Sequence, residues 1–262
     1  MDFFLVDAFT KIPFRGNPAS VCLNDNAIGE KVMQEIAMEM NQSETAFVVP
    51  LENRRLSQAS LFSLRWFTPV KEVELCGHAT VAAAKVLFML QKERNEELSF
   101  ETRSGVLKVK AVEDSLLMQL PIHKPKSLFS NVSLKEALMV DEIVNIMWDN
   151  KLGYLLVHLP QEKDVAGINP DFNALLGLDL EFDLNGLIVT SKGSEPYDFV
   201  SRFFAPWLGI NEDPVTGSSH TILFPYWENI TGNSEMRTRQ LSGRGGELWV
   251  RRHDTANLEI QG

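Results

Sequence analysis

Three polar side chains stand beside apolar segments, where a folded chain could use them for proton transfer. Glu44 precedes an apolar run that begins at Thr45, and His78 and Asp213 lie next to the first residues of two apolar segments. A carboxylate can remove a proton from carbon and return it elsewhere, and a histidine can relay it. Each also has a plain structural explanation. An acid before proline commonly fixes a turn, a single histidine is more often structural, and Glu44 alone would be a solvated charge at a strand edge.

Two buried helices are expected to position these side chains. One opens at Gly77 and stays apolar over 79–87, and the other opens at Gly217 and Ser218 and stays apolar over 222–226. Both are too apolar to lie on a surface. The backbone N–H groups and the dipole of a helix start attract a carboxylate, so two such starts facing one cleft would hold a small anion. The alternative is that the glycines only permit close packing and Ser218 only caps its helix.

The composition is that of an ordinary globular protein. Hydrophobic residues make up 44% and charged residues 23% of the 262 residues, without the bias of a disordered or fibrous chain. A net charge of −10 repels nucleic acid and anionic lipid, and no segment approaches the ~20 apolar residues of a membrane span. The N-terminus has no signal-peptide pattern, and two cysteines suit a reducing compartment. We therefore expect a soluble cytoplasmic protein that binds neither nucleic acid nor membranes.

Motifs for nucleotides and for catalytic zinc are absent from the sequence. No Gly-x-Gly-x-x-Gly follows a predicted strand, and there is no Walker or His-Glu-x-x-His sequence. The glycine-rich stretch at 243–246 precedes a predicted strand, so we interpret it as a hairpin turn rather than a phosphate loop.

Strands dominate the predicted elements. Short alternating or apolar runs predict strands at 3–9, 45–49, 61–67, 106–111, 116–120, 154–159, 187–190, 199–204 and 247–250. Apolar residues spaced by four predict a further amphipathic helix over 28–40.

The chain also contains an internal echo. The sequence Arg-Trp-Phe-Thr-Pro at 65–69 and the sequence Arg-Phe-Phe-Ala-Pro at 202–206 each end a strand, and a loop, a glycine and a buried helix follow both. The copies lie 137 residues apart, about half the chain, as an ancient duplication would leave them. The polar stretch at 123–127 is the expected boundary, with an N-terminal lobe over 1–124 and a C-terminal lobe over 125–262. We predict an α+β fold of two pseudo-symmetric lobes facing each other across one pocket.

In these residues the chain resembles the PhzF, or phenazine biosynthesis-like, family of the diaminopimelate-epimerase-like fold. The matching motifs lie in the family's order at 6–10, 16–18, 43–47, 77–80, 212–218 and 244–248, and they cover nearly the whole chain. The resemblance implies that each lobe is a strand-rich, barrel-like sheet around a central helix, with the active site between the lobes.

Members of this family with assigned chemistry isomerise a dihydro-hydroxyanthranilate by moving a proton without a cofactor. Carried over position by position, the resemblance implies catalytic roles for Glu44, His78 and Asp213, and substrate binding by Gly77, Gly217 and Ser218. Desolvation would raise the proton affinity of the glutamate and suit it to both halves of the transfer. We expect a small cyclic or amino-acid-like carboxylate as substrate, neither cofactor nor metal, and a homodimer.

Two other functions stay open at this point. Related epimerases use two opposed cysteines at the starts of the central helices, and Cys76 stands at one such place, but Thr216 stands at the other. Two-thiol chemistry is therefore disfavoured, which leaves an amino-acid epimerase that uses Glu44 or Cys76 as one base. The remaining alternative is a non-catalytic member that binds a metabolite or a protein.

The C-terminus departs from the family's pattern. Chains of this family usually continue past a segment like 258–262 into one more strand, and this chain stops there. In the wider fold the last strand returns to the first lobe. The sequence therefore predicts that the returning strand is missing.

Overall fold

The computed structural model describes residues 1–51, 54–91, 95–128 and 132–262, and it divides the chain into two compact units. Unit 1 comprises Met1–Leu120 together with Glu259–Gly262, and unit 2 comprises Pro121–Leu258. The sequence places the division at 124/125 and assigns everything after it to the second lobe. In the structure the division lies at 120/121, four residues earlier, and Glu259–Gly262 belong to unit 1.

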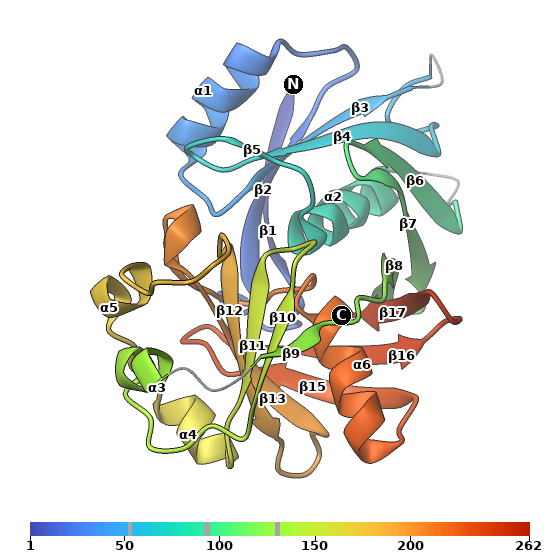
Figure 1. Ribbon diagram of the computed structural model, residues 1–262. Coiled ribbons are helices and arrows are strands. Elements are labelled where there is room, and N and C mark those ends of the chain that lie inside the picture. Colours follow the sequence, from blue (N-terminus) through green and yellow to red (C-terminus); the bar gives the residue numbers. More distant parts are fainter. Residues whose placement is uncertain (52–53, 92–94, 129–131) are drawn as a thin grey trace. The chain divides into compact units, whose positions relative to one another are not determined.

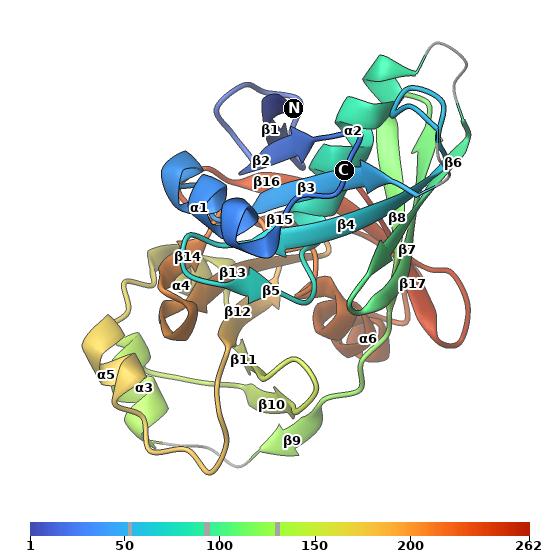
Figure 2. The same ribbon diagram turned by 90° about the horizontal axis from the view of Figure 1, so that it is seen from above.

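Unit 1 consists of strands around one long helix (Figure 1). Its elements in chain order are β1 Asp2–Ala8, β2 Asn17–Leu23, α1 Glu30–Met40, β3 Thr45–Pro50, β4 Leu61–Phe67, β5 Glu72–Val73, α2 Gly77–Leu90, β6 Glu97–Thr102, β7 Gly105–Val112 and β8 Ser115–Pro121. All the strands that the sequence predicts in this half are present, and so is the amphipathic helix, as α1. Figure 2 shows α1 lying beside β3 and β4, which it contacts.

Helix α2 is the centre of unit 1, as the sequence predicts. It begins at Gly77, and an unbroken run from Gly77 to Ala84 is buried. The helix contacts β1, β2, β3 and β7, so it meets strands on several sides. A helix without a polar face must be covered all round. Neither α2 nor any other helix in the described part of the chain is long and apolar enough to cross a membrane.

Unit 2 places one helix on one side of its strands and three short helices on the other (Figure 1). Its elements are β9 Lys126–Leu128, α3 Val132–Leu138, β10 Asn145–Asp149, β11 Tyr154–His158, α4 Glu162–Gly167, α5 Phe172–Leu176, β12 Gly186–Lys192, β13 Phe199–Ala205, the 3₁₀ helix η1 Pro206–Leu208, β14 Ile210–Asp213, α6 His220–Thr231, β15 Glu235–Gln240 and β16 Gly246–Arg252. The last strand, β17 Asn257–Gln261, begins in unit 2 and ends in unit 1. Apolar side chains of α3, α4 and α5 form one core cluster with those of β10 to β13. The turn predicted at 243–246 is confirmed, since it joins the antiparallel strands β15 and β16.

The two units repeat one strand topology. In unit 1, β1 and β2 are antiparallel, β2 and β3 parallel, β3 and β4 antiparallel, β4 pairs with both β5 and β6, and β6 and β7 are antiparallel. The strands β10 to β16 of unit 2 repeat these pairings in the same order and with the same directions. The central helix follows the fifth strand in each, as α2 and α6. The predicted duplication therefore has a structural counterpart.

An arginine–glutamate pair marks the same place in both copies. Arg65 on β4 donates to both carboxylate oxygens of Glu72 on β5, over 2.7 and 2.6 Å. Arg202 on β13 donates likewise to Glu212 on β14, over 2.7 and 2.9 Å. Two-point contact between a guanidinium and a carboxylate fixes geometry as well as charge. Each pair therefore clamps the strand that leads to a central helix.

The expectation of a missing final strand is wrong. Residues 257–261 form β17, which pairs with β8, and Glu259–Gly262 belong to unit 1. The backbone N–H of Leu116 donates to the Gly262 carbonyl over 3.4 Å, and the Gly262 N–H donates back over 3.3 Å. The short segment thus supplies the returning strand itself. The sequence alone did not reveal this because five residues carry too little pattern to identify a strand.

Candidate active site

Glu44 stands immediately before β3 in unit 1. Its backbone carbonyl accepts a hydrogen bond from the Ser20 N–H on β2 over 3.2 Å, which is part of the parallel pairing of Ser20 with Thr45. The Glu44 side chain is only 15% exposed. The carboxylate is therefore largely withdrawn from water.

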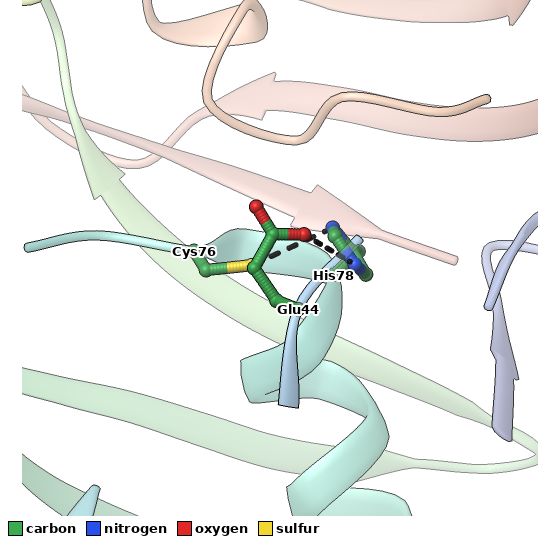
Figure 3. Close-up of side chains that lie close together, drawn as sticks. All are labelled: Glu44, Cys76 and His78. Carbon is green, nitrogen blue, oxygen red and sulfur yellow. Dashed lines mark hydrogen bonds and ion pairs between the residues drawn. The ribbon is translucent and has the colours of Figure 1, made fainter. Parts of the chain in front are cut away.

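His78 and Cys76 come to Glu44 from the beginning of α2 (Figure 3). His78 Nε2 lies 3.3 Å from Glu44 Oε2, and His78 Nδ1 lies 3.5 Å from Cys76 Sγ. Figure 3 shows the carboxylate directed at the imidazole ring, with the thiol beside it. The extended backbone of Cys76 precedes the helix, and its side chain makes no capping hydrogen bond. Two of the predicted site residues, Glu44 and His78, therefore lie together in unit 1, and their catalytic roles stay predictions.

The neighbours of His78 define where its proton lies. The Asn17 amide Nδ2 can only donate, and it lies 3.2 Å from Nδ1, so Nδ1 accepts. The single ring proton of a neutral imidazole is then on Nε2, which lies 3.3 Å from Ser43 Oγ as well as from Glu44. Ser43 Oγ donates onward to the Pro18 carbonyl over 3.4 Å. Burial lowers the pKa of His78 to about 3, which keeps the ring neutral at pH 7.

Glu44, Cys76 and His78 also offer three potential metal ligands. One ligand atom from each lies within 4.8 Å of the others. A thiolate, an imidazole and a carboxylate are the ligand types that zinc accepts. These three side chains could therefore bind a metal ion or transfer a proton without one. Treatment with a chelator distinguishes the two possibilities, because it abolishes only an activity that depends on a metal.

Asp213 lies at the end of β14 in unit 2 and is 8% exposed. It pairs with Phe203 on β13, directly after the clamped Glu212. The Thr216 hydroxyl donates to Asp213 Oδ2 through a short hydrogen bond. The side chain of Asp213 is therefore held within its own loop.

Gly217 and Ser218 precede α6 rather than open it. The helix begins at His220, and the residues before it form tight turns, with the N–H groups of His220 and Thr221 each donating over 3.1 Å to the carbonyls of Gly217 and Ser218. The predicted helix start at Gly217 is thus three residues early, because a 3₁₀-type entry turn has the same local sequence signals as the helix. Ser218 Oγ lies 3.2 Å from the hydroxyl of Tyr154.

The predicted site residues therefore form two groups, one in each unit. Glu44, Gly77 and His78 lie together in unit 1, and Asp213, Gly217 and Ser218 occupy one loop of unit 2. Their convergence on a single pocket between the lobes stays a prediction.

Sequence reasoning gave no role to four neighbours of these groups. They are Asn17 and Ser43 beside His78, Gln240 beside Thr216, and Tyr154 beside Ser218. Asn17 and Ser43 lie inside the family motifs at 16–18 and 43–47, and this position in the motifs is the sequence signal that could have identified them. Gln240 and Tyr154 lie in strands far along the chain, where no local pattern connects them to the loop that they contact.

Comparison with known proteins identifies relatives along the whole chain. The family model described as "Phenazine biosynthesis-like protein" matches residues 6–262. A mouse protein named phenazine biosynthesis-like domain-containing protein 1 is 42% identical over 274 residues, covering 100% of this chain and 95% of the relative. An uncharacterized isomerase of Pseudomonas aeruginosa is 44% identical over 251 residues, covering 96% and 90%. A crystal structure of a PhzF-family phenazine biosynthesis protein from Enterococcus faecalis superposes with a TM-score of 0.90 at 40% identity, covering 99% and 94%.

Proposed function

Because the chain belongs to the phenazine biosynthesis-like family, we propose that it is an isomerase that moves a proton on a small cyclic or amino-acid-like carboxylate, with Glu44 as the general acid/base. The relative from Pseudomonas aeruginosa carries the name isomerase, which supports the reaction class. The fold alone does not select a substrate, since one fold supports several chemistries.

The contact between Glu44 and a neutral His78 carries this proposal. A charged imidazole would form an ion pair with the carboxylate and weaken it as a base. His78 stays neutral because burial depresses its pKa, so it can orient Glu44 without neutralising it. Glu44 takes the proton from a substrate carbon, the electron pair spreads into the conjugated system, and the same carboxyl group returns the proton to another carbon.

The beginning of α2 supplies the electrostatic counterpart. No capping side chain covers this helix start at Cys76, and Gly77 is its first residue. Backbone N–H groups and the helix dipole favour negative charge there. We assign Gly77 to holding the substrate carboxylate or the charge that develops on the ring during proton transfer.

In unit 2 we assign Gly217 and Ser218 to substrate binding and Asp213 to hydrogen bonding or proton relay. Ser218 is only partly buried and already shares a hydrogen bond with Tyr154, so its hydroxyl can exchange that partner for a ligand. Asp213 supplies the second carboxylate. A reaction that moves a proton between two carbons needs a group to bind the polar substituents and keep the substrate from turning.

A second candidate function rests on Cys76. Its Sγ lies 3.5 Å from His78 Nδ1 at the uncapped beginning of α2, where the helix dipole favours the negative charge of a thiolate base. An amino-acid epimerase would use this thiol in place of Glu44. A non-catalytic binding protein would use neither group for proton transfer.

Solvent-deuterium exchange distinguishes these functions. The protein is incubated in D₂O with a panel of carboxylates (a dihydro-hydroxyanthranilate, proline, trans-4-hydroxyproline and diaminopimelate), and deuterium at carbon is followed by NMR and mass spectrometry. The Glu44→Gln variant should lose exchange by at least about a hundredfold. Cys76→Ser should retain it. Cys22→Ala is the matched thiol control, because Cys22 is fully buried and its pKa is raised to about 11.

Four outcomes would contradict the proposal. Exchange that survives Glu44→Gln removes this residue as the base, and loss on Cys76→Ser alone supports the epimerase. Carboxylates that bind without any exchange support a binding protein. Loss of exchange after dialysis against EDTA, restored by zinc, would mean that Glu44, Cys76 and His78 hold a metal.

A further inference from the structure

A buried hydrogen-bond network lies behind Asp213. The Thr216 N–H donates to Gln240 Oε1 over 2.9 Å, and Gln240 Nε2 donates to the Asp213 carbonyl over 2.7 Å and to Thr216 Oγ1 over 3.3 Å. The exposed fractions are 1% for Gln240, 6% for Thr216 and 8% for Asp213. Neither Thr216 nor Gln240 belongs to the groups to which the proposed function assigns chemistry.

The direction of every bond in this network is fixed. A backbone N–H can only donate and a backbone carbonyl can only accept, so the amide of Gln240 has one possible orientation. Its Nε2 faces the Thr216 hydroxyl, which therefore receives one hydrogen bond and donates its own proton to Asp213 Oδ2. Two donors in series thus end on the carboxylate, and hydrogen bonds in such a chain strengthen one another.

Unit 1 has the same strand topology as unit 2, so the equivalent positions in unit 1 show whether the fold itself needs this network. The matching registers Trp66↔Val73 and Phe203↔Asp213 place Val73 at the position of Asp213. Cys76 stands at the position of Thr216, as both precede the glycine before the central helix.

The third position of the network also differs in unit 1. The pairings Phe62↔Phe100 and Phe199↔Thr238 place Thr102 at the position of Gln240, and the Thr102 hydroxyl donates to Gly105 within its own hairpin. Unit 1 therefore forms the same fold without counterparts of the Asp213, Thr216 and Gln240 side chains. Folding alone does not account for them in unit 2.

We propose that Thr216 and Gln240 are positioning residues that hold the Asp213 carboxylate in its reactive orientation. This inference rests on the proposed function, because it takes Asp213 as the group that contacts substrate. A carboxylate side chain turns freely about two bonds, and a displacement of about 1 Å can cost a hundredfold in rate. The hydroxyl of Thr216 fixes one carboxylate oxygen, and Gln240 fixes the backbone from which both side chains start.

The test compares Thr216→Val with Thr216→Ser. Valine keeps the volume and removes the donor, whereas serine keeps the donor. In the solvent-exchange assay, with the carboxylate that the wild-type protein turns over, Thr216→Val should lower kcat at least about tenfold and change KM less than about threefold. Thr216→Ser should restore kcat to within about threefold of wild type. Thr238→Val is the matched control, because this buried hydroxyl on β15 has no hydrogen-bond partner within the described structure.

A second variant covers the case in which Thr216→Val does not fold. Gln240→Met keeps the length of the side chain and removes both of its polar groups, and circular dichroism reports whether each variant is folded. Gln240→Met alone should lower kcat at least about tenfold, as Thr216→Val does. Where both single variants fold, the double variant should lower kcat no further than the worse single variant, because the two residues act on one carboxylate. A product of the two single effects would overturn a shared role.

A readout without catalysis separates this inference from the proposed function. In protein labelled with ¹³C-aspartate, the Asp213 carboxyl resonance is assigned by its loss in Asp213→Asn. Its chemical shift should change in Thr216→Val and stay the same in Thr216→Ser and Thr238→Val.

An unchanged chemical shift in Thr216→Val overturns the positioning role even if the enzyme is active. If no carboxylate exchanges in wild type, the proposed function fails, and the resonance alone still decides whether Thr216 holds Asp213. An unchanged kcat in a folded Thr216→Val that has a moved resonance also overturns the inference.

Discussion

His78 Nε2 lies 3.3 Å from Glu44 Oε2, and the proton on that nitrogen is put there by Asn17 on the opposite side of the ring. The Asn17 amide donates to Nδ1, so only Nε2 can carry the proton of the neutral ring. The acid/base character of the site therefore depends on a residue on the far side of the imidazole ring. In metal sites and catalytic triads a partner on the far ring nitrogen sets the tautomer in the same way.

Replacing the donor on Nδ1 should reverse the tautomer. In Asn17→Asp the carboxylate accepts from Nδ1, so the proton leaves Nε2 and a lone pair faces Glu44. We expect at least about a tenfold fall in the exchange rate, and ¹⁵N NMR of the His78 ring should report the Nδ1–H form. Asn24→Asp is the matched control, since the Asn24 side chain donates locally to the Asn26 carbonyl over 2.6 Å. An unchanged tautomer in Asn17→Asp would contradict the assignment.

The two buried histidines should make stability fall as the solution becomes acidic. Desolvation lowers the pKa of His78 to about 3 and that of His220 to about 4, from an ordinary value of 6.5. Below pH 6.5 the unfolded chain binds protons that the folded chain does not. The stability that each neutral ring contributes is complete above pH 6.5 and is lost as the pH falls towards the folded pKa, by about 1.4 kcal/mol per pH unit and histidine.

Urea unfolding at pH 7, 6 and 5 measures this dependence. The free energy of unfolding of His78→Gln should fall less steeply with decreasing pH than that of wild type, and the same holds for His220→Gln. Parallel pH profiles for wild type and both variants would show that neither ring is the group that titrates on unfolding.

Much of unit 1 could be predicted from the sequence, because its signals are local. The helix start at Gly77 follows from a glycine before an uninterrupted apolar run, and the structure begins α2 there. Glu44 and His78 stand in recognisable motifs, and the structure brings them into contact. The short strands β5 and β9 have two and three residues and show no periodicity, so they could not be predicted.

The network behind Asp213 could not be predicted, because its members are joined only through the tertiary fold. Gln240 lies 24 residues beyond Thr216, on a strand whose alternating pattern marks it simply as a buried position. Propensity and motif spacing report on neighbours along the chain, whereas the hydrogen bonds of Gln240 depend on the register of β13 with β15.

The arginine–glutamate clamps should contribute similarly to the two units. The side chain of Glu72 is 8% exposed and that of Glu212 is 23% exposed, so both pairs are partly shielded from water. Glu72→Gln and Glu212→Gln should each lower the free energy of unfolding by about 1–3 kcal/mol, with the larger loss at Glu72. The more exposed pair of Arg237 and Glu247, whose side chains are 32% and 46% exposed, provides the control, and Glu247→Gln should cost less than about 1 kcal/mol. Equal costs at all three glutamates in urea unfolding would argue against a special role for the clamps.

Unit 2 has a glycine, Gly186, at the position that Glu44 occupies in unit 1. The registers Thr45↔Phe67 and Leu187↔Phe204 make Gly186 the equivalent of Glu44.

A side chain at Gly186 would collide with the Phe203 ring, because an added Cβ would lie 2.3 Å from Cζ. Phe203 is buried and packs edge-on against Tyr154, which leaves it little room to move. Gly186→Ala should therefore destabilise the protein by about 1–3 kcal/mol. Phe203→Leu in the same chain should recover a large part of that loss, because the shorter side chain vacates the space. Gly167→Ala, where no atom lies within 4 Å of the added carbon, should change stability by less than about 1 kcal/mol. If Gly186→Ala unfolds at the urea concentration of wild type, the ring can yield, and the absence of a second glutamate needs another cause than steric exclusion.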